Sequence, residues 1–68
     1  MTLSARNLLK GTVKEVKKGQ VMAEATIEVA PGVDITSTIT TSSVEKLGIT
    51  KGKEVTVVIK ATSVMLDA

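Results

Sequence analysis

Apolar and polar residues alternate along much of this chain, and a period of two is typical of strands with one buried face. The clearest run covers residues 21–29, with valine, alanine or isoleucine at every odd position. A threonine-rich run covers residues 35–40, and residues 8–17 form an earlier strand in which Gly11 favours a bulge or bend. Two turns are predicted to join these three strands, at Lys18-Gly19-Gln20 and at Pro31-Gly32.

The pattern changes after the third strand, where a short helix is predicted over residues 42–47. Its signals are a capping-box spacing, an apolar anchor and a glycine suited to end a helix: Ser42-x-x-Glu45, Leu47 and Gly48. A turn at Lys51-Gly52 leads to a strand over residues 54–60 and a short final strand over residues 63–66. This order predicts a mostly β fold: a five-stranded OB-type barrel with one short helix between strands 3 and 4, forming a single domain over residues 1–68.

Composition makes the core of such a barrel thin. The 68 residues include no Phe, Tyr, Trp, Cys or His, so aromatic packing, disulfides and common zinc sites are absent. Apolar residues still make up 43% of the chain, which argues against disorder. Since small domains often need a further source of stability, we expect subunits to complete each other's cores in an obligate oligomer.

Charge narrows the possible partners. Nine Lys and Arg against seven Asp and Glu leave a net charge of +2, which is too small to indicate nucleic acid or a membrane. A single-stranded nucleic-acid module of the OB type remains the alternative hypothesis, although such modules stack bases on aromatic side chains and this chain has none. No signal-peptide pattern and no run of roughly 20 apolar residues occur, so a soluble cytoplasmic protein is expected.

The residue types favour binding over catalysis. Nucleophilic catalysis needs a base beside the nucleophile, and neither His nor Cys is available. Hydroxyls, backbone amides and a few cations instead suit a small tetrahedral dianion. Two segments offer that mixture, Ser4-Ala5-Arg6-Asn7 and Lys60-Ala61-Thr62-Ser63. Taken alone, Arg6 and Lys60 are better explained as ordinary solvated charges, one on the surface and one at a strand end.

At these residues the sequence resembles the Mop family, the molbindins, over nearly the whole chain. The resemblance rests on the opening Ser4-Ala5-Arg6-Asn7-Leu8-Leu9-Lys10-Gly11, a threonine-rich middle strand, and two later segments, Ser43-Val44-Glu45-Lys46-Leu47-Gly48 and Lys60-Ala61-Thr62-Ser63-Val64-Met65. It implies an OB-type fold, a hexamer built as a trimer of dimers, and molybdate or tungstate bound between subunits for storage or homeostasis. It implies no organic cofactor, no directly ligated metal, no nucleic acid and no membrane.

Carried over by position, the resemblance nominates eight oxyanion-binding residues: Ser4, Arg6, Asn7, Thr40, Ser43, Lys60, Ala61 and Thr62. Lys60 would supply charge, the hydroxyl residues would supply hydrogen bonds, and Ala61 would supply only its backbone N–H. Arg6 would contact the anion through its main chain or through its guanidinium. A purely structural oligomerisation domain that binds nothing is the third hypothesis.

Overall fold

The computed structural model describes residues 6–68, and Ser4 lies outside that range. Four strands form one antiparallel sheet in the order β3-β2-β1-β4. Their bounds, with those of one α-helix and one 3₁₀ turn, are β1 Asn7–Lys18, β2 Met22–Ala30, β3 Val33–Thr40, α1 Thr41–Leu47, β4 Glu54–Ile59 and η1 Ala61–Ser63. The mostly β fold and the position of the helix after the third strand are as predicted.

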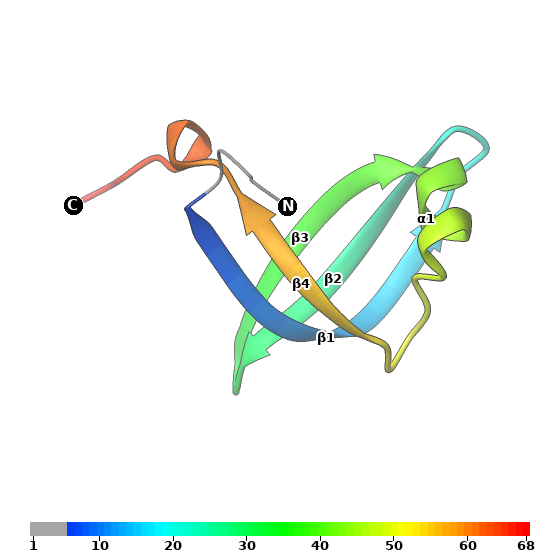
Figure 1. Cartoon of the computed structure of the whole chain (residues 1–68), viewed down its shortest axis with the longest axis horizontal. Helices are drawn as coiled ribbons and strands as arrows, with labels where there is room; N and C mark the ends of the chain where they lie inside the picture. The colour runs from blue at the N-terminus through cyan, green and yellow to red at the C-terminus, as the bar shows by residue number, and fades with distance from the viewer. Residues whose placement is uncertain (1–5) are drawn as a thin grey trace.

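Strand β1 holds the barrel together because it pairs with two strands in succession. Its first half pairs with β4, from Asn7 opposite Ile59 to Thr12 opposite Glu54, and its second half pairs with β2. Figure 1 shows β1 curving through the bottom of the molecule so that both of its ends point upward. The sheet therefore curls into an OB-type barrel whose two edge strands, β3 and β4, are not paired with each other.

The prediction that Gly11 produces a bulge or bend in β1 is only partly correct. The register shift lies between Val13 and Glu15, so the bulge falls after Gly11 and not at it. Gly11 instead permits a close approach: a Cβ there would lie 2.6 Å from Ile27 Cγ2 and 2.7 Å from the Glu28 carbonyl oxygen. The absence of a side chain at Gly11 lets β1 and β2 pack together where β1 turns toward β4.

The core is as thin as the composition predicted. Among the described residues, the fully buried apolar side chains are few and mostly small: Val13, Ala23, Ala25, Ile27 and Val44. Val13 comes from β1, and the next three come from alternating positions along β2, as the period of two requires. Helix α1 contributes Val44 and contacts β2 and β3.

The helix begins one residue earlier than predicted, and Ser42 is not its cap. Thr40 is the N-cap: its backbone is extended and its hydroxyl oxygen accepts a hydrogen bond from the Ser43 N–H at 3.1 Å. Ser42 lies inside the first turn. The Ser-x-x-Glu spacing therefore predicted a helix in the correct region but assigned its N-cap to the wrong residue. Gly48 ends the helix with a left-handed φ of 65°, as predicted.

The predicted fifth strand over residues 63–66 is wrong for the single chain. Ser63 ends η1, and residues 64–68 pair with no strand of the described chain. Figure 1 shows this C-terminal segment leaving the barrel, and the side chains of Met65 and Leu66 are 93% and 94% exposed. An apolar, extended segment becomes a strand only where it exchanges hydrogen bonds with a neighbouring strand, and residues 64–68 do so with none of the four described strands. Within residues 6–68, no helix is long and apolar enough to cross a membrane.

Candidate functional site

Pairing of β1 with β4 brings two of the predicted site segments together. Asn7 lies opposite Ile59, and the Asn7 side-chain amide donates a hydrogen bond to the Ile59 carbonyl oxygen at 3.3 Å. Arg6 and Lys60 are the next residues beyond this last pair, so both lie at the same end of the β1–β4 ladder. The start of the described chain and the end of β4 thus form one cluster, although 52 residues separate Asn7 from Ile59.

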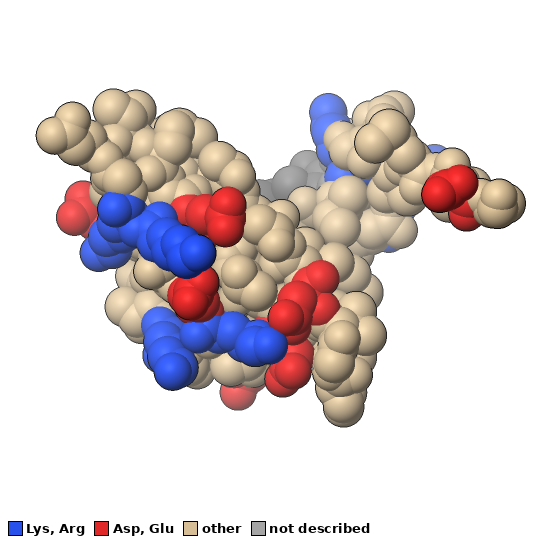
Figure 2. Space-filling view, turned by 180° about the vertical axis from the view of Figure 1, so that it is seen from behind, with Lys and Arg blue, Asp and Glu red and all other residues tan. Residues whose placement is uncertain are grey.

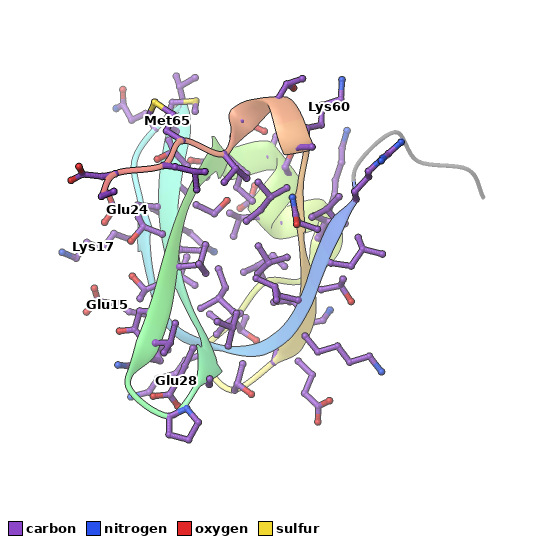
Figure 3. All side chains as sticks on the ribbon, turned by 90° about the vertical axis from the view of Figure 1, so that its left-hand side faces the viewer. Glu15, Lys17, Glu24, Glu28, Lys60 and Met65 are labelled. Atoms are coloured by element: carbon purple, nitrogen blue, oxygen red, sulfur yellow. The ribbon has the colours of Figure 1, made fainter. Side chains whose placement is uncertain are left out.

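The cluster carries two cations and no counter-ion from the described chain. Arg6 and Lys60 are both exposed, and the ion pairs formed among residues 6–68 are Lys14–Asp34 and Lys17–Glu15. Like charges close together repel each other, and a bound anion would offset this repulsion. Figure 3 shows Lys60 at the end of β4, pointing away from the barrel, where a dissolved anion can reach it.

Backbone donors lie beside these cations. Lys60 is the N-cap of η1, and no side chain caps this 3₁₀ turn. The first N–H groups of such a turn have no acceptor within it, so the turn leaves those of Ala61 and Thr62 to other partners. Lys60, Ala61 and Thr62 therefore offer one positive charge, one hydroxyl and two backbone donors within three residues.

Thr40 and Ser43 form a separate hydroxyl pair at the start of α1. The Thr40 hydroxyl donates to Ser43 Oγ at 2.7 Å and also accepts from the Ser43 N–H. Since the Thr40 proton is used in this bond, the Ser43 hydroxyl retains its own proton for another acceptor. Figure 1 places α1 and η1 on opposite sides of the barrel, so one chain does not bring this pair to the Arg6–Lys60 cluster.

The outer surface of β1 and β2 has a different character, with positive and negative side chains interleaved. Figure 2 shows this mixture over the back of the molecule, and Figure 3 shows Glu15, Lys17, Glu24 and Glu28 pointing outward. Lys14 of β1 reaches Asp34 of β3 at 3.0 Å. The hydrogen bond to Asp34, and next the charge of Asp34, raise the pKa of Lys14. This surface is not the continuous basic groove that a single-stranded nucleic acid follows.

Residues 6–68 contain no group of three or more His, Cys, Asp or Glu side chains arranged to hold a metal ion. No buried side-chain nitrogen or oxygen of these residues lacks a hydrogen-bond partner.

Two features of the site region could not be anticipated from local sequence patterns. The first is the juxtaposition of Arg6 and Lys60, which depends on the β1–β4 register. The second is Thr41, whose hydroxyl and N–H both contact the hairpin between β1 and β2. A threonine between a strand and a helix is too common for its sequence position to have revealed this contact.

Comparison with known proteins connects this geometry to a family. Residues 3–66 match the family model described as the TOBE domain. The chain is 53% identical to molybdenum-pterin-binding protein 3 of Clostridium pasteurianum, with both proteins covered in full. It is similar to the solved structure of a molybdate-binding protein from Sporomusa ovata, at 38% identity and a TM-score of 0.93, with both chains covered in full.

A third relative was solved with its ligand. The structure of the cytoplasmic molybdate-binding protein ModG with molybdate bound matches at 45% identity and a TM-score of 0.90, over 96% of this chain and 46% of that one. The names of these three relatives all describe binding proteins. By full-length identity, by fold and by its TOBE domain, the chain belongs to the Mop family of molybdenum-pterin-binding proteins.

Proposed function

We propose that this chain is a binding protein, not an enzyme, and that its ligand is molybdate or tungstate. The observation that carries the proposal is the position of Arg6 and Lys60, directly beyond the paired ends of β1 and β4, with no carboxylate in an ion pair with either among residues 6–68. A tetrahedral dianion between them would neutralise both charges and accept hydrogen bonds from the adjacent backbone. The relatives named for molybdate binding support this choice of anion.

The eight nominated residues take different roles in this proposal. Lys60 and Arg6 supply charge, and Ala61 and Thr62 supply backbone donors, with the Thr62 hydroxyl beside them. Asn7 also holds β1 to the end of β4, since its amide already donates to Ile59. Ser43 donates a hydroxyl to the anion while Thr40 orients Ser43. Ser4 completes the opening segment as a hydroxyl donor.

The site is completed by a second subunit. Because one chain separates the Thr40–Ser43 pair from the Arg6–Lys60 cluster, both contact one anion only if they come from different copies. A homo-oligomer, specifically a hexamer built as a trimer of dimers, would provide this boundary.

Exposed apolar surface independently supports association. Between the edge strands β3 and β4 lies an apolar hollow of about 210 Å³, lined by residues that include Ile39, Leu47 and Val57. Met65 and Leu66 are almost fully exposed on the C-terminal segment. Both features leave apolar surface in water, and a second copy would cover it.

Storage or homeostasis of the anion in the cytoplasm is the physiological role that we propose. Neutral hydroxyl and amide donors around a few cations suit reversible binding, because excess positive charge would retain a dianion too strongly. Size would separate molybdate and tungstate from sulfate, which has the same shape and charge. The anion would be held through its oxygens, without an organic cofactor and without direct ligation of the metal by the protein.

Calorimetry tests the proposal. The wild-type protein is titrated with sodium molybdate, sodium tungstate and sodium sulfate, and we expect heat with the first two and much weaker binding of sulfate. If neither molybdate nor tungstate produces heat or a thermal shift, the proposal is wrong. A salt-dependent gel shift with single-stranded DNA in the same preparation would favour the nucleic-acid alternative instead.

The variant Lys60→Ala identifies the site within that experiment. Loss of a charged donor costs about 1.5–3 kcal/mol, so affinity for molybdate should fall about 10- to 100-fold while the fold is retained. Lys51→Ala is the matched control, because Lys51 is an exposed lysine in the turn before β4 and should leave the affinity unchanged. Equal affinities for the two variants would place the anion elsewhere.

A further inference from the structure

The hairpin between β1 and β2 lies directly against the start of α1, next to the Thr40–Ser43 pair. The backbone N–H of Thr41 donates to the Val21 carbonyl oxygen at 2.8 Å, and the Thr41 hydroxyl donates to the Gly19 carbonyl oxygen at 2.8 Å. Both contacts reach residues of the hairpin loop from a single residue of the helix. Thr41 is therefore fastened to the hairpin through its main chain and its side chain.

The hairpin is well suited to act as a fixed support. The Gly19 N–H donates to the Met22 carbonyl oxygen at 2.8 Å and closes the loop. A Cβ at position 19 would lie 2.7 Å from that same oxygen, so this tight closure depends on glycine. The Gly19 carbonyl oxygen, which accepts the hydrogen bond from the Thr41 hydroxyl, thus belongs to a loop whose shape is tightly constrained.

Thr41 lies between the two residues of the hydroxyl pair. Thr40 precedes it as the helix cap, and Ser43 follows it in the first turn with its N–H and Oγ both bonded to Thr40 Oγ1. Any rotation of this turn about the strand end would move the Ser43 hydroxyl. The bond from Thr41 to Gly19 opposes that rotation, because it ties the turn to a second element.

We infer that Thr41 is a positioning residue for the oxyanion site. Its hydroxyl donates to the Gly19 carbonyl oxygen and so keeps the Ser43 hydroxyl in position to donate to the anion, while Thr41 itself does not contact the anion. This inference rests on the proposed function, because it assigns Ser43 to the anion. It predicts that the hairpin influences anion affinity although none of its residues contacts the ligand. Positioning of a donor to within a fraction of an ångström is what a supporting contact of this kind supplies.

The test compares Thr41→Val, which removes only the hydroxyl, with Thr41→Ser, which keeps it. Molybdate affinity of the folded proteins is measured by calorimetry well below their melting temperatures. We expect Thr41→Val to weaken binding about tenfold, the effect of one misplaced hydrogen bond, and Thr41→Ser to restore it to within about twofold of wild type. Thr36→Val is the matched control, because Thr36 is an exposed β3 residue for which no side-chain hydrogen bond is found among the described residues.

Each outcome decides the question. A merely structural Thr41 would lower the melting temperature of the anion-free protein and leave the molybdate affinity unchanged, and that result would overturn the inference while the proposed function stands. If the wild-type protein itself binds no molybdate or tungstate, the proposed function fails and this inference fails with it. Should Thr41→Val not fold, Gly19→Ala replaces it, since the added methyl displaces the acceptor while Thr41 stays intact; unchanged affinity in that variant would equally reject the inference.

Discussion

Lys14 shows how a single exposed residue links strands that are not neighbours in the sheet. It lies at the bulge of β1, and its ammonium group reaches across β2 to Asp34 on β3. The hydrogen bond with Asp34 raises the pKa of Lys14 above its ordinary value of 10.5. A raised pKa in the folded protein means that the protonated lysine favours the folded state.

The sign of this effect fixes a pH dependence. Its stabilising contribution is fully present below pH 10.5 and is lost as the pH rises through the raised pKa of Lys14. Asp34→Asn should therefore lower the melting temperature slightly between pH 7 and pH 9, and the difference from wild type should shrink at higher pH. Thermal melts from pH 7 to above the raised pKa of Lys14 check the prediction, with Glu24→Gln as the exposed control. A difference that persists above that pKa would contradict it.

The candidate site shows what single residues reveal in sequence and what they do not. Residue types made an anion site plausible, because hydroxyls and cations gather at Arg6 and at Lys60, and the resemblance to the Mop family supplied the anion and the nominated residues. Local patterns did not reveal that these two residues lie at the same end of the β1–β4 ladder, since that depends on the register between the two strands. The separation of Ser43 from them was equally invisible, because it depends on the curvature of the whole sheet.

Strand β1 is the element on which the barrel depends, and its bend rests on Gly11. The close approach at Gly11 involves the Ile27 side chain and the Glu28 carbonyl oxygen, so a methyl group there meets both a core residue and rigid backbone. Of these two neighbours, only Ile27 can move by changing its rotamer. Opening the bend would separate the β2 side of the barrel from the β4 side.

Gly11→Ala should consequently be among the more destabilising single substitutions in the chain. Overpacking of this kind typically costs about 1–3 kcal/mol, and we expect a loss near the upper end because backbone is involved. Urea denaturation of Gly11→Ala and of Lys10→Ala compares a tight position with an exposed neighbour, for which a change within about 0.5 kcal/mol is expected. Equal midpoints for the two variants would show that β1 bends without needing glycine at position 11.

Elements were predicted well where their signals are local. Alternation placed each of the first three strands within two residues of its observed ends, and Gly48 placed the end of α1. The start of α1 was misassigned because Thr40 and Ser42 are both favoured N-cap residues, and only Ser42 is followed by the Glu of a capping box, at Glu45. Only the extended backbone of Thr40 decides between them, and that conformation follows from its pairing with Met22 in β2.

At the scale of the whole molecule, a second copy of the chain would account for both the thin core and the projecting apolar segment. The fully buried apolar residues among those described are Val and Ala with a single Ile, while Leu8, Val58, Met65 and Leu66 remain substantially exposed. The predicted fifth strand failed for a related reason: residues 63–66 have strand-like composition, but within the described chain they pair with no other strand. A second copy of the chain could supply such a strand and cover the exposed side chains.

The C-terminal segment provides the decisive test of assembly. Burial of Met65 and Leu66 against a neighbour would contribute about 1.5–3 kcal/mol each, so the double substitution Met65→Ser and Leu66→Ser should shift the oligomer toward smaller species. Sedimentation velocity at micromolar concentration measures this shift, with Asp67→Asn as a control in the same segment. A folded wild-type monomer would contradict the oligomer itself. A double variant that sediments like wild type would show that the C-terminal segment covers no neighbour.

Dissociation should also weaken molybdate binding, because the proposed anion site joins Ser43 of one copy to Lys60 of another. Calorimetry of the dissociated double variant measures this loss. A monomer that keeps full affinity would place the whole site within one chain.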